Sequence, residues 1–284
     1  MKLPSDAASP SSTVGARLAR YYDLDLLDDP GDVDLYLALV ARRSGPILEL
    51  GAGSGRIAVP LAAAGHEVTA VDLDPEMLDR ATARWKEVRG AGSTEWPARS
   101  RTSAERHNAP GRLHAVVGDM TSIRLEERFD LVIIALNTLL QLGEADAQLA
   151  ALRTVAAHLS PKGRAVIDVW LPAPEDLALY DGRVIFEWQR DDPETGESVS
   201  KFASARYDAA TAVVTLSQWF DAVRGPSGPL TRTSRTDRMR LVPAAELTHL
   251  ATLAGLTAQR LAGDYRMAPF GPGDERAILI GRLI

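Results

Sequence analysis

The sequence predicts an α/β fold, in which a seven-stranded mixed sheet has helices on both faces and a small antiparallel β appendage follows strand five. Three observations support this prediction. Short apolar runs alternate with amphipathic segments from residue 46 to residue 167. Residues 129–136 (FDLVIIAL) are nearly all apolar, as a strand buried on both faces should be. Residues 183–241 show the alternation of polar and apolar side chains that antiparallel strands favour.

The elements of the main domain can be placed in chain order. Strands are expected at residues 46–50, 66–71, 113–117, 129–136, 165–169, 256–265 and 276–283. Helices are expected at 57–64, from Pro75 through Trp85 after an N-cap at Asp74, at 148–159 and at 243–256. A turn at 161–163 should precede the fifth strand.

The remaining segments define the domain boundaries. The main domain is expected to comprise residues 16–182 and 242–284, after a flexible N-terminus of residues 1–15. The appendage, residues 183–241, should form strands at 184–188, 199–207, 212–223 and 230–241, and could be a substrate lid or a dimer contact. Residues 89–112 show no periodicity and are predicted to be a solvated loop.

Composition excludes several classes of function. A net charge of -6 gives no broad attraction to nucleic acid, and the absence of cysteine excludes disulfides and thiolate metal sites. The five histidines are scattered without metal-ligand spacing, so no metal site is expected. No signal peptide and no apolar run of about 20 residues is visible, which favours a soluble cytoplasmic protein without a membrane partner.

Polar residues follow the expected strands at their carboxyl ends. Asp72, Asp119, Asn137 and Trp170 each lie at or just after such an end. The carboxyl ends of parallel strands meet at one edge of a sheet, where α/β proteins bind their ligands. We therefore expect these residues to converge on one cleft.

A glycine-rich turn, Gly51-Ala52-Gly53-Ser54-Gly55, joins the first strand to a helix. Such a turn lets a ligand approach the backbone, and Asp72, about twenty residues on, can accept hydrogen bonds from both hydroxyls of a ribose. Arg56 stands where the dinucleotide fingerprint needs its third glycine. The Glu49 carboxylate would repel a pyrophosphate, but it would favour the ammonium and sulfonium of S-adenosylmethionine (SAM).

These residues resemble a known family. Glu49-Leu50-Gly51-Ala52-Gly53-Ser54-Gly55 is similar to motif I of the class I SAM-dependent methyltransferases, and the order of elements matches theirs from Pro46 onward. Gly118-Asp119-Met120 and the FDLVIIALN strand stand at the expected places. Tyr21-Tyr22-Asp23 resembles a segment that closes over the cofactor in many small-molecule members. The resemblance implies a Rossmann-like fold, SAM as cofactor, and methyl transfer to a small-molecule acceptor.

The resemblance also implies roles for individual residues. At the methionine end of SAM, Gly51, Ala52 and Gly53 would offer their backbone, Glu49 would orient the amino group, and Tyr22 would reach the carboxylate, with Tyr21 as the alternative. The residues implied at the adenosine end and the methyl group are Asp72 for the ribose, Leu73 and Met77 flanking adenine, Gly118, Asp119 and Met120 at its edge, and Leu136 beside the methyl donor.

The acceptor side is less well defined. Asn137, Trp170, Tyr180 and Trp188 are the candidate substrate-binding residues, and the catalytic residue is unknown. No histidine falls at a strand's carboxyl end, because His66 and His114 begin their strands. An amine needs only to arrive unprotonated, whereas a hydroxyl usually needs a base, so nitrogen is favoured over oxygen.

Two other functions remain open at this point. A nicotinamide-dependent oxidoreductase would need glycine in place of Arg56 and usually a catalytic Tyr/Lys pair, and no YxxxK is present. A non-catalytic SAM-binding regulatory domain would share motif I, because binding is not turnover. The sequence leaves the choice between a monomer and a homo-oligomer undecided.

Overall fold

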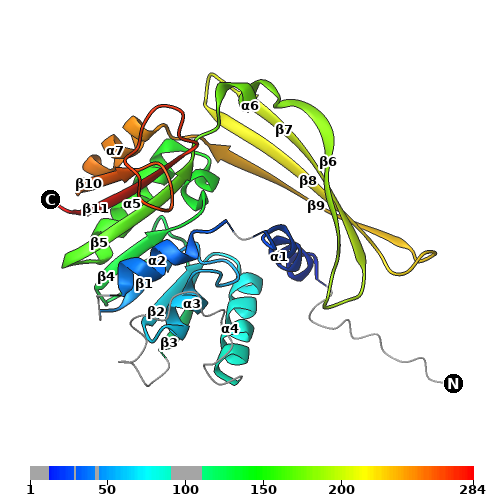
Figure 1. Cartoon of the computed structure of the whole chain (residues 1–284), viewed down its shortest axis with the longest axis horizontal. Coiled ribbons are helices and arrows are strands. Elements are labelled where there is room, and N and C mark those ends of the chain that lie inside the picture. The colour runs from blue at the N-terminus through cyan, green and yellow to red at the C-terminus, as the bar shows by residue number, and fades with distance from the viewer. Residues whose placement is uncertain (1–12, 29, 42–44, 91–110) are drawn as a thin grey trace.

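A computed structural model describes residues 13–28, 30–41, 45–90 and 111–284, which form two sheets and the helices around them (Figure 1). The larger, sheet A, has seven strands in the order β10-β11-β5-β4-β1-β2-β3. Its strands are β1 Ile47–Leu50, β2 Glu67–Asp72, β3 Arg112–Val117, β4 Phe129–Ile134, β5 Leu159–Trp170, β10 Leu256–Ala262 and β11 Arg276–Leu283. Strands β1 to β5 pair in parallel, while β11 is antiparallel to both β5 and β10. The predicted seven-stranded mixed sheet is therefore confirmed.

Helices cover both faces of sheet A. The helices are α2 Val33–Val40, α3 Ala58–Ala63 and α4 Pro75–Gly90 on one face, and α5 Ala145–His158 and α7 Ala244–Leu253 on the other. Alternate residues of β5 supply the two cores, because Ile167 packs with α5 and α7 whereas Val166 packs with α2 and α3. Two buried carboxyl groups lie on the face of sheet A that α2 covers, namely Glu49 of β1 and Asp168 of β5.

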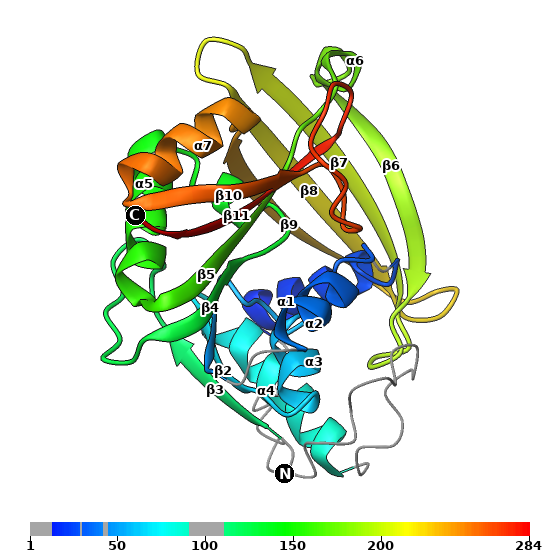
Figure 2. The same cartoon turned by 60° about the vertical axis from the view of Figure 1, so that its left-hand side comes forward.

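Sheet B is the antiparallel appendage. Its strands follow one another in space and in sequence as β6 Asp181–Asp191, β7 Ser198–Asp208, β8 Val213–Val223 and β9 Leu230–Arg240. It is a long, curved sheet that projects from the main domain, and helix α1, Val14–Asp25, lies between its far end and α4 (Figures 1 and 2). Two short helices, η3 Thr138–Leu142 and α6 Pro174–Ala178, complete the described elements.

The structure moves several predicted boundaries. Strand β5 already begins at Leu159 and contains the predicted turn at 161–163. Phe129 pairs with Leu159 but Leu131 pairs with Arg164, so the extra residues form an irregularity within the strand rather than a separate turn. Strand β4 ends at Ile134, two residues early, because Leu136 and Asn137 adopt positive φ values of 43° and 67°.

The termini of the predicted irregular segments also shift. Of the predicted loop at 89–112, residues 91–110 lie outside the described residues, while Arg89 belongs to α4 and Arg112 to β3. Residues 1–12 of the predicted flexible N-terminus lie outside them as well, and α1 begins at Val14. The sequence predicts no element where α1 and α2 form. No helix in the described part of the chain is long and apolar enough to span a membrane.

Candidate functional site

The glycine-rich turn is fastened to the end of β2 at the carboxyl edge of sheet A. The N–H groups of Gly51 and Ala52 donate to the Val71 carbonyl at 2.8 and 2.9 Å, and the Gly53 N–H donates to Asp72 Oδ2 at 2.7 Å. Gly51 and Gly53 have φ values of +74° and +54°, which glycine adopts without strain. The turn and the β2 end therefore form one rigid unit.

Close packing above Gly51 excludes any side chain there. A Cβ on Gly51 would lie 2.2 Å from Thr138 Cγ2 and 2.9 Å from Met120 Cε, both of which are too short for real contacts. Thr138 comes from η3 and Met120 from the segment after β3, so two neighbouring loops converge on the bare backbone of the turn. This is the close approach for which the sequence pattern needs a glycine.

A cavity of about 200 Å³ lies beside this backbone. It brings together six residues predicted for the adenosine end and the turn, namely Gly51, Asp72, Leu73, Gly118, Asp119 and Met120. Three further lining residues, Thr138, Gln141 and Leu142, belong to η3 and were not predicted. They could have been anticipated, because they directly follow Asn137 at the end of the fourth strand. Ala52 and Met77 lie outside the lining.

The two aspartates of the cavity are held by backbone hydrogen bonds. Asp72 accepts from Gly53 and, through Oδ1, from the Asp74 N–H at 2.9 Å. An ionised carboxylate has about four lone-pair sites, so Asp72 can still accept two hydroxyls. Asp119 Oδ1 accepts from both the N–H and the hydroxyl of Thr121 at 2.7 Å, and Oδ2 accepts no hydrogen bond from the described residues. Asp119 thus both forms a turn and offers an oxygen to the cavity.

A cluster of buried ionisable side chains lies on the α2 side of the turn. The Glu49 carboxyl is 3% exposed and accepts a backbone hydrogen bond from Ala58. Burial raises the pKa of Glu49 to about 8, and the nearby Arg56 guanidinium opposes this shift. Arg56 makes a bidentate ion pair with Asp32, which precedes α2 and is fully buried. Arg56, which occupies the third glycine position of the dinucleotide fingerprint, therefore lies at the site rather than on the open surface.

Two polar atoms of this cluster have no hydrogen-bond partner within the described residues. They are Glu49 Oε2, an acceptor, and Arg56 Nε, a donor, and both are fully shielded from solvent. A buried polar atom without a partner costs free energy, so such atoms in a site indicate positions for ligand groups.

The neighbouring tyrosines of α1 face in different directions. The Tyr22 ring lies about 3.7 Å from the position that a Cβ of Gly53 would occupy, and Arg56 and Glu49 both act on its hydroxyl electrostatically. Tyr21 instead stacks on Phe220 of sheet B with ring centroids 4.9 Å apart. Tyr22 is therefore the tyrosine at the turn, and Tyr21 anchors α1 to sheet B.

The end of β4 forms the border between the cavity and sheet B. Asn137 Oδ1 accepts the Trp170 N–H at 2.6 Å, and Asn137 N–H donates to the Asp168 carbonyl at 3.2 Å. The Asp168 carboxylate accepts from Leu136 N–H at 3.3 Å, from Tyr265 Oη at 3.1 Å and from Arg276 Nη1 at 2.6 Å. This bonding holds Leu136 and Asn137 in left-handed conformations that non-glycine residues rarely adopt.

The predicted acceptor residues divide between two places. Trp170 and Tyr180 lie together with ring centroids 6.4 Å apart, and Asn137 is bonded to the Trp170 backbone. Trp188 lies elsewhere, because its indole N–H donates to Asp25 of α1 at 2.8 Å and its ring packs near Phe220. The structure thus groups three of the four residues and assigns Trp188 to the contact between α1 and sheet B.

Asn137 offers a test of whether this border depends on its side chain. Replacing Asn137 by alanine is expected to lower the free energy of unfolding by about 1–2 kcal/mol, because the Trp170 N–H loses its acceptor and alanine must hold a positive φ. Urea denaturation measures the change. Asn137→Asp keeps an acceptor oxygen and tolerates the left-handed region, so it should retain most of the stability. Equal stability of the alanine variant and the wild type would contradict this account.

Comparisons with known proteins agree with this geometry. Residues 48–165 match a family model described as a methyltransferase domain. The chain is 26% identical over 225 residues to the cypemycin N-terminal methyltransferase of a Streptomyces species, covering 79% of this chain and 77% of the relative. It is 25% identical in sequence to the CcbJ methyltransferase of Streptomyces caelestis, with a TM-score of 0.69 and coverage of 97% and 99%.

The fold is shared more widely than the sequence. A SAM-dependent methyltransferase from Clostridium acetobutylicum superposes with a TM-score of 0.72 at 16% identity, covering 94% of this chain and 98% of that one. The sugar N-methyltransferase KedS8 from Streptoalloteichus gives a TM-score of 0.66 at 18% identity, with 99% of both chains covered. Both superpositions extend over nearly the whole of each chain.

Proposed function

The chain belongs to the class I SAM-dependent methyltransferases, and we propose that it methylates an amine nitrogen of a small-molecule acceptor. The observation that carries the choice of nitrogen is the state of Asp168, the buried carboxylate at the end of β5. Its oxygens are already bonded to Arg276, Tyr265 and the Leu136 N–H. A carboxylate held in this way is poorly placed to take a proton from a hydroxyl, whereas a neutral amine needs no such base.

The residues at the turn fit SAM. Its methionine end carries an ammonium and a carboxylate, and the two unpartnered buried atoms are an acceptor, Glu49 Oε2, and a donor, Arg56 Nε. We assign the ammonium to Glu49 and the carboxylate to Arg56 and Tyr22. Asp72 would accept the ribose hydroxyls, with the adenine in the cavity against Leu73, where Asp119 Oδ2 could accept its amino group. Buried ionic groups require such compensation, which favours a zwitterionic ligand.

Methyl transfer requires little of the protein beyond alignment of the acceptor with the methyl group. SAM supplies an electrophilic sulfonium methyl group, so the protein has to orient the acceptor nitrogen toward it and keep water out. Leu136 and Asn137, fixed at the end of β4, would form the wall beside the methyl group. The acceptor amine would have to reach the site in its neutral form, and the methylated ammonium product could then lose a proton to solvent.

We place the acceptor on the face of sheet B that packs against α1 and the main domain, which is called its inner face. The strand register identifies the side chains on that face. Phe220 stacks on Tyr21 of α1, and Val214, six residues away on the same face of β8, packs into the core of the main domain. Leu216 and Gln218 lie between them on that face, because alternate residues of a strand point the same way. Their partners on β9 are Asp237 and Arg235.

This part of sheet B is polar and charge-balanced. Arg235 and Asp237 form a bidentate ion pair at 2.7 and 2.8 Å, and Gln218 beside them is only 8% exposed. Together with the rings of Trp170 and Tyr180, such a surface suits an acceptor that combines hydrogen-bonding groups with an apolar face. An amino sugar or the N-terminal residue of a short peptide has this character.

The test compares matched acceptors. Amino sugars and short peptides are each offered with methyl-labelled SAM beside the analogue in which a hydroxyl replaces the amine. Methyl transfer to the amine is expected to exceed transfer to the hydroxyl by at least about a hundredfold, since no positioned base assists the hydroxyl. The rate should rise with pH toward the pKa of the acceptor amine. Comparable labelling of the hydroxyl analogues would reject the nitrogen assignment.

A further inference from the structure

Helix α1 carries the residues that touch the glycine-rich turn from outside sheet A. Asp23 Oδ1 accepts the Ser54 hydroxyl at 2.5 Å, and Tyr22 covers Gly53. The turn therefore contacts a helix that precedes the first strand of the main domain by more than twenty residues. The contacts that hold α1 in this position therefore determine how stably Tyr22 and Asp23 stay against the turn.

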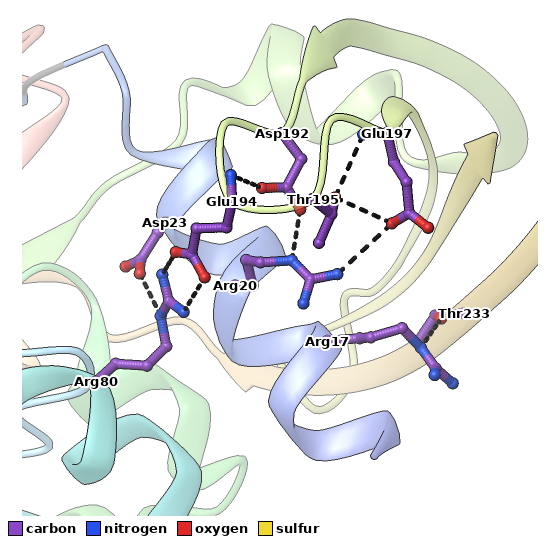
Figure 3. Close-up of polar contacts among 9 residues, drawn as sticks. All are labelled: Arg17, Arg20, Asp23, Arg80, Asp192, Glu194, Thr195, Glu197 and Thr233. Atoms are coloured by element: carbon purple, nitrogen blue, oxygen red, sulfur yellow. Dashed lines mark hydrogen bonds and ion pairs between the residues drawn. The ribbon is translucent and has the colours of Figure 1, made fainter. Parts of the chain in front are cut away.

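One arginine joins α1, the main domain and sheet B. Arg80 of α4 donates from Nε to Asp23 Oδ2 at 2.5 Å, and its two Nη atoms donate to Glu194 at 3.2 and 2.6 Å (Figure 3). Glu194 belongs to the turn between β6 and β7, at the far end of sheet B. A continuous polar chain thus runs from Ser54 in the glycine-rich turn, through Asp23 and Arg80, to Glu194.

A second, buried contact lies beside this chain. Arg20 of α1 donates from Nε to Asp192 at 2.5 Å and has Glu197 at 3.8 Å, and all three side chains meet in the same β6–β7 turn (Figure 3). The side chain of Arg20 is 6% exposed and that of Asp192 is fully buried. Asp192 also accepts the Glu194 N–H at 2.9 Å, so the two acidic residues are held by one backbone turn.

The ion pairs continue along α1. Lys201 of β7 bonds both oxygens of Asp25 at 2.7 and 2.6 Å, and the Trp188 indole donates to the same carboxylate. Sheet B is thus bonded to α1 at Arg20 and at Asp25, on either side of Tyr22 and Asp23. Burial of such pairs makes the contact specific, because a shifted helix would leave charges buried without partners.

We propose that the β6–β7 turn is a latch for the cofactor site, in which Asp192 and Glu194 act through Arg20 and Arg80 to hold Tyr22 and Asp23 against the glycine-rich turn. Asp192 and Glu194 are positioning residues, because they touch α1 and α4 rather than the cofactor. Sheet B then sets how fast the cofactor leaves, in addition to any contact with the acceptor. The inference rests on the proposed cofactor site but not on the identity of the acceptor.

The experiment measures the release of S-adenosylhomocysteine (SAH) by stopped-flow displacement and the hydrogen exchange of α1 amides in the cofactor-free protein. Glu194→Gln is expected to speed SAH release about two- to fivefold, since Glu194 is half exposed. Asp192→Asn removes the buried carboxylate charge beside Arg20 and leaves only Glu197, 3.8 Å away, as an acidic neighbour, so about tenfold faster release is expected. In both variants exchange should rise in α1 while α5 keeps its protection.

The matched control is Asp181→Asn. Asp181 forms an ion pair with Arg183 at 2.7 Å on the same sheet, at the end of β6 opposite the latch. Its loss should change neither SAH release nor exchange in α1. If the latch variants behave like this control, the proposal is overturned.

A double-mutant comparison covers the case in which Asp192→Asn disturbs folding. Arg80→Met removes the guanidinium that bonds Asp23 and Glu194 together, so it should speed SAH release at least as much as Glu194→Gln does. Combining the two should add nothing further, because both break the same link. Effects that multiply would show that Glu194 does not act through Arg80 and would reject the latch. Neither readout uses an acceptor, so a failure of the nitrogen assignment leaves both measurements valid.

Discussion

Replacing Asp72 by alanine is expected to weaken SAH binding by at least about a hundredfold. Two ribose hydroxyls would lose a charged acceptor, and hydrogen bonds to charged groups contribute about 1.5–3 kcal/mol each. The variant also removes the acceptor of the Gly53 N–H, which the wild type holds at 2.7 Å. The glycine-rich turn would then lose its side-chain link to β2 together with its ligand contact. Isothermal titration with SAH measures the change.

Asp74→Ala provides the matched control for this measurement. Asp74 lies two residues further on and accepts the Glu76 N–H at 2.9 Å at the start of α4. Its loss should lower stability by about 1 kcal/mol, as the loss of a helix cap does, and should change SAH affinity by less than about twofold. Equal losses of affinity in the two variants would mean that Asp72 acts only by supporting the loop.

Much of the cavity could be predicted from the sequence because of one geometric rule. Parallel strands end at a common edge, so residues as distant in the chain as Gly51, Asp72 and Asp119 must meet once the strands are identified. The structure brings all three to the same cavity. The same rule placed Asn137 beside Trp170, although it could not reveal that the two are joined by a hydrogen bond.

The remaining features depend on contacts that no local pattern encodes. From the sequence alone, Arg56 resembles a solvent-exposed residue. The structure shows that it pairs with Asp32, 24 positions earlier. The partner of Arg20 is Asp192, 172 residues away, on a turn whose position depends on the whole of sheet B. Only its aromatic character groups Trp188 with the acceptor residues, and that character cannot show that its indole N–H donates to Asp25 of α1. Periodicity predicts which face of an element is buried, but not which distant element covers it.

The affinity for SAH is expected to rise about tenfold between pH 6 and pH 7 and about fivefold more by pH 8, and then to level off. Burial raises the pKa of Glu49 to about 8 in the cofactor-free protein, so the carboxyl is protonated at pH 6. The ammonium of SAH binds the ionised form, and binding below pH 8 must therefore release a proton. Across these two pH units the affinity should change about fiftyfold.

The stability of the cofactor-free protein should follow pH in the opposite direction. Because the folded pKa of Glu49 lies above its usual value of 4.5, the folded state binds more protons than the unfolded state between about pH 4.5 and pH 8. The contribution of Glu49 to the free energy of unfolding is therefore fully present below pH 4.5 and is lost as the pH rises to 8. Thermal denaturation over this range, compared with Glu49→Gln, isolates that contribution.

Titrations in two buffers of different ionisation enthalpy count the protons directly. About one proton should be released per SAH at pH 6 and about one half at pH 8, where Glu49 is half ionised. Glu49→Gln should bind SAH more weakly at pH 8 and release no proton. Methylthioadenosine, which keeps the ribose and adenine but lacks the amino-acid end, should bind with the same affinity at both pH values. A wild-type affinity for SAH that is constant from pH 6 to pH 8 would instead show that no ionised Glu49 carboxylate holds the ammonium, because binding to the ionised form requires the carboxyl to lose its proton.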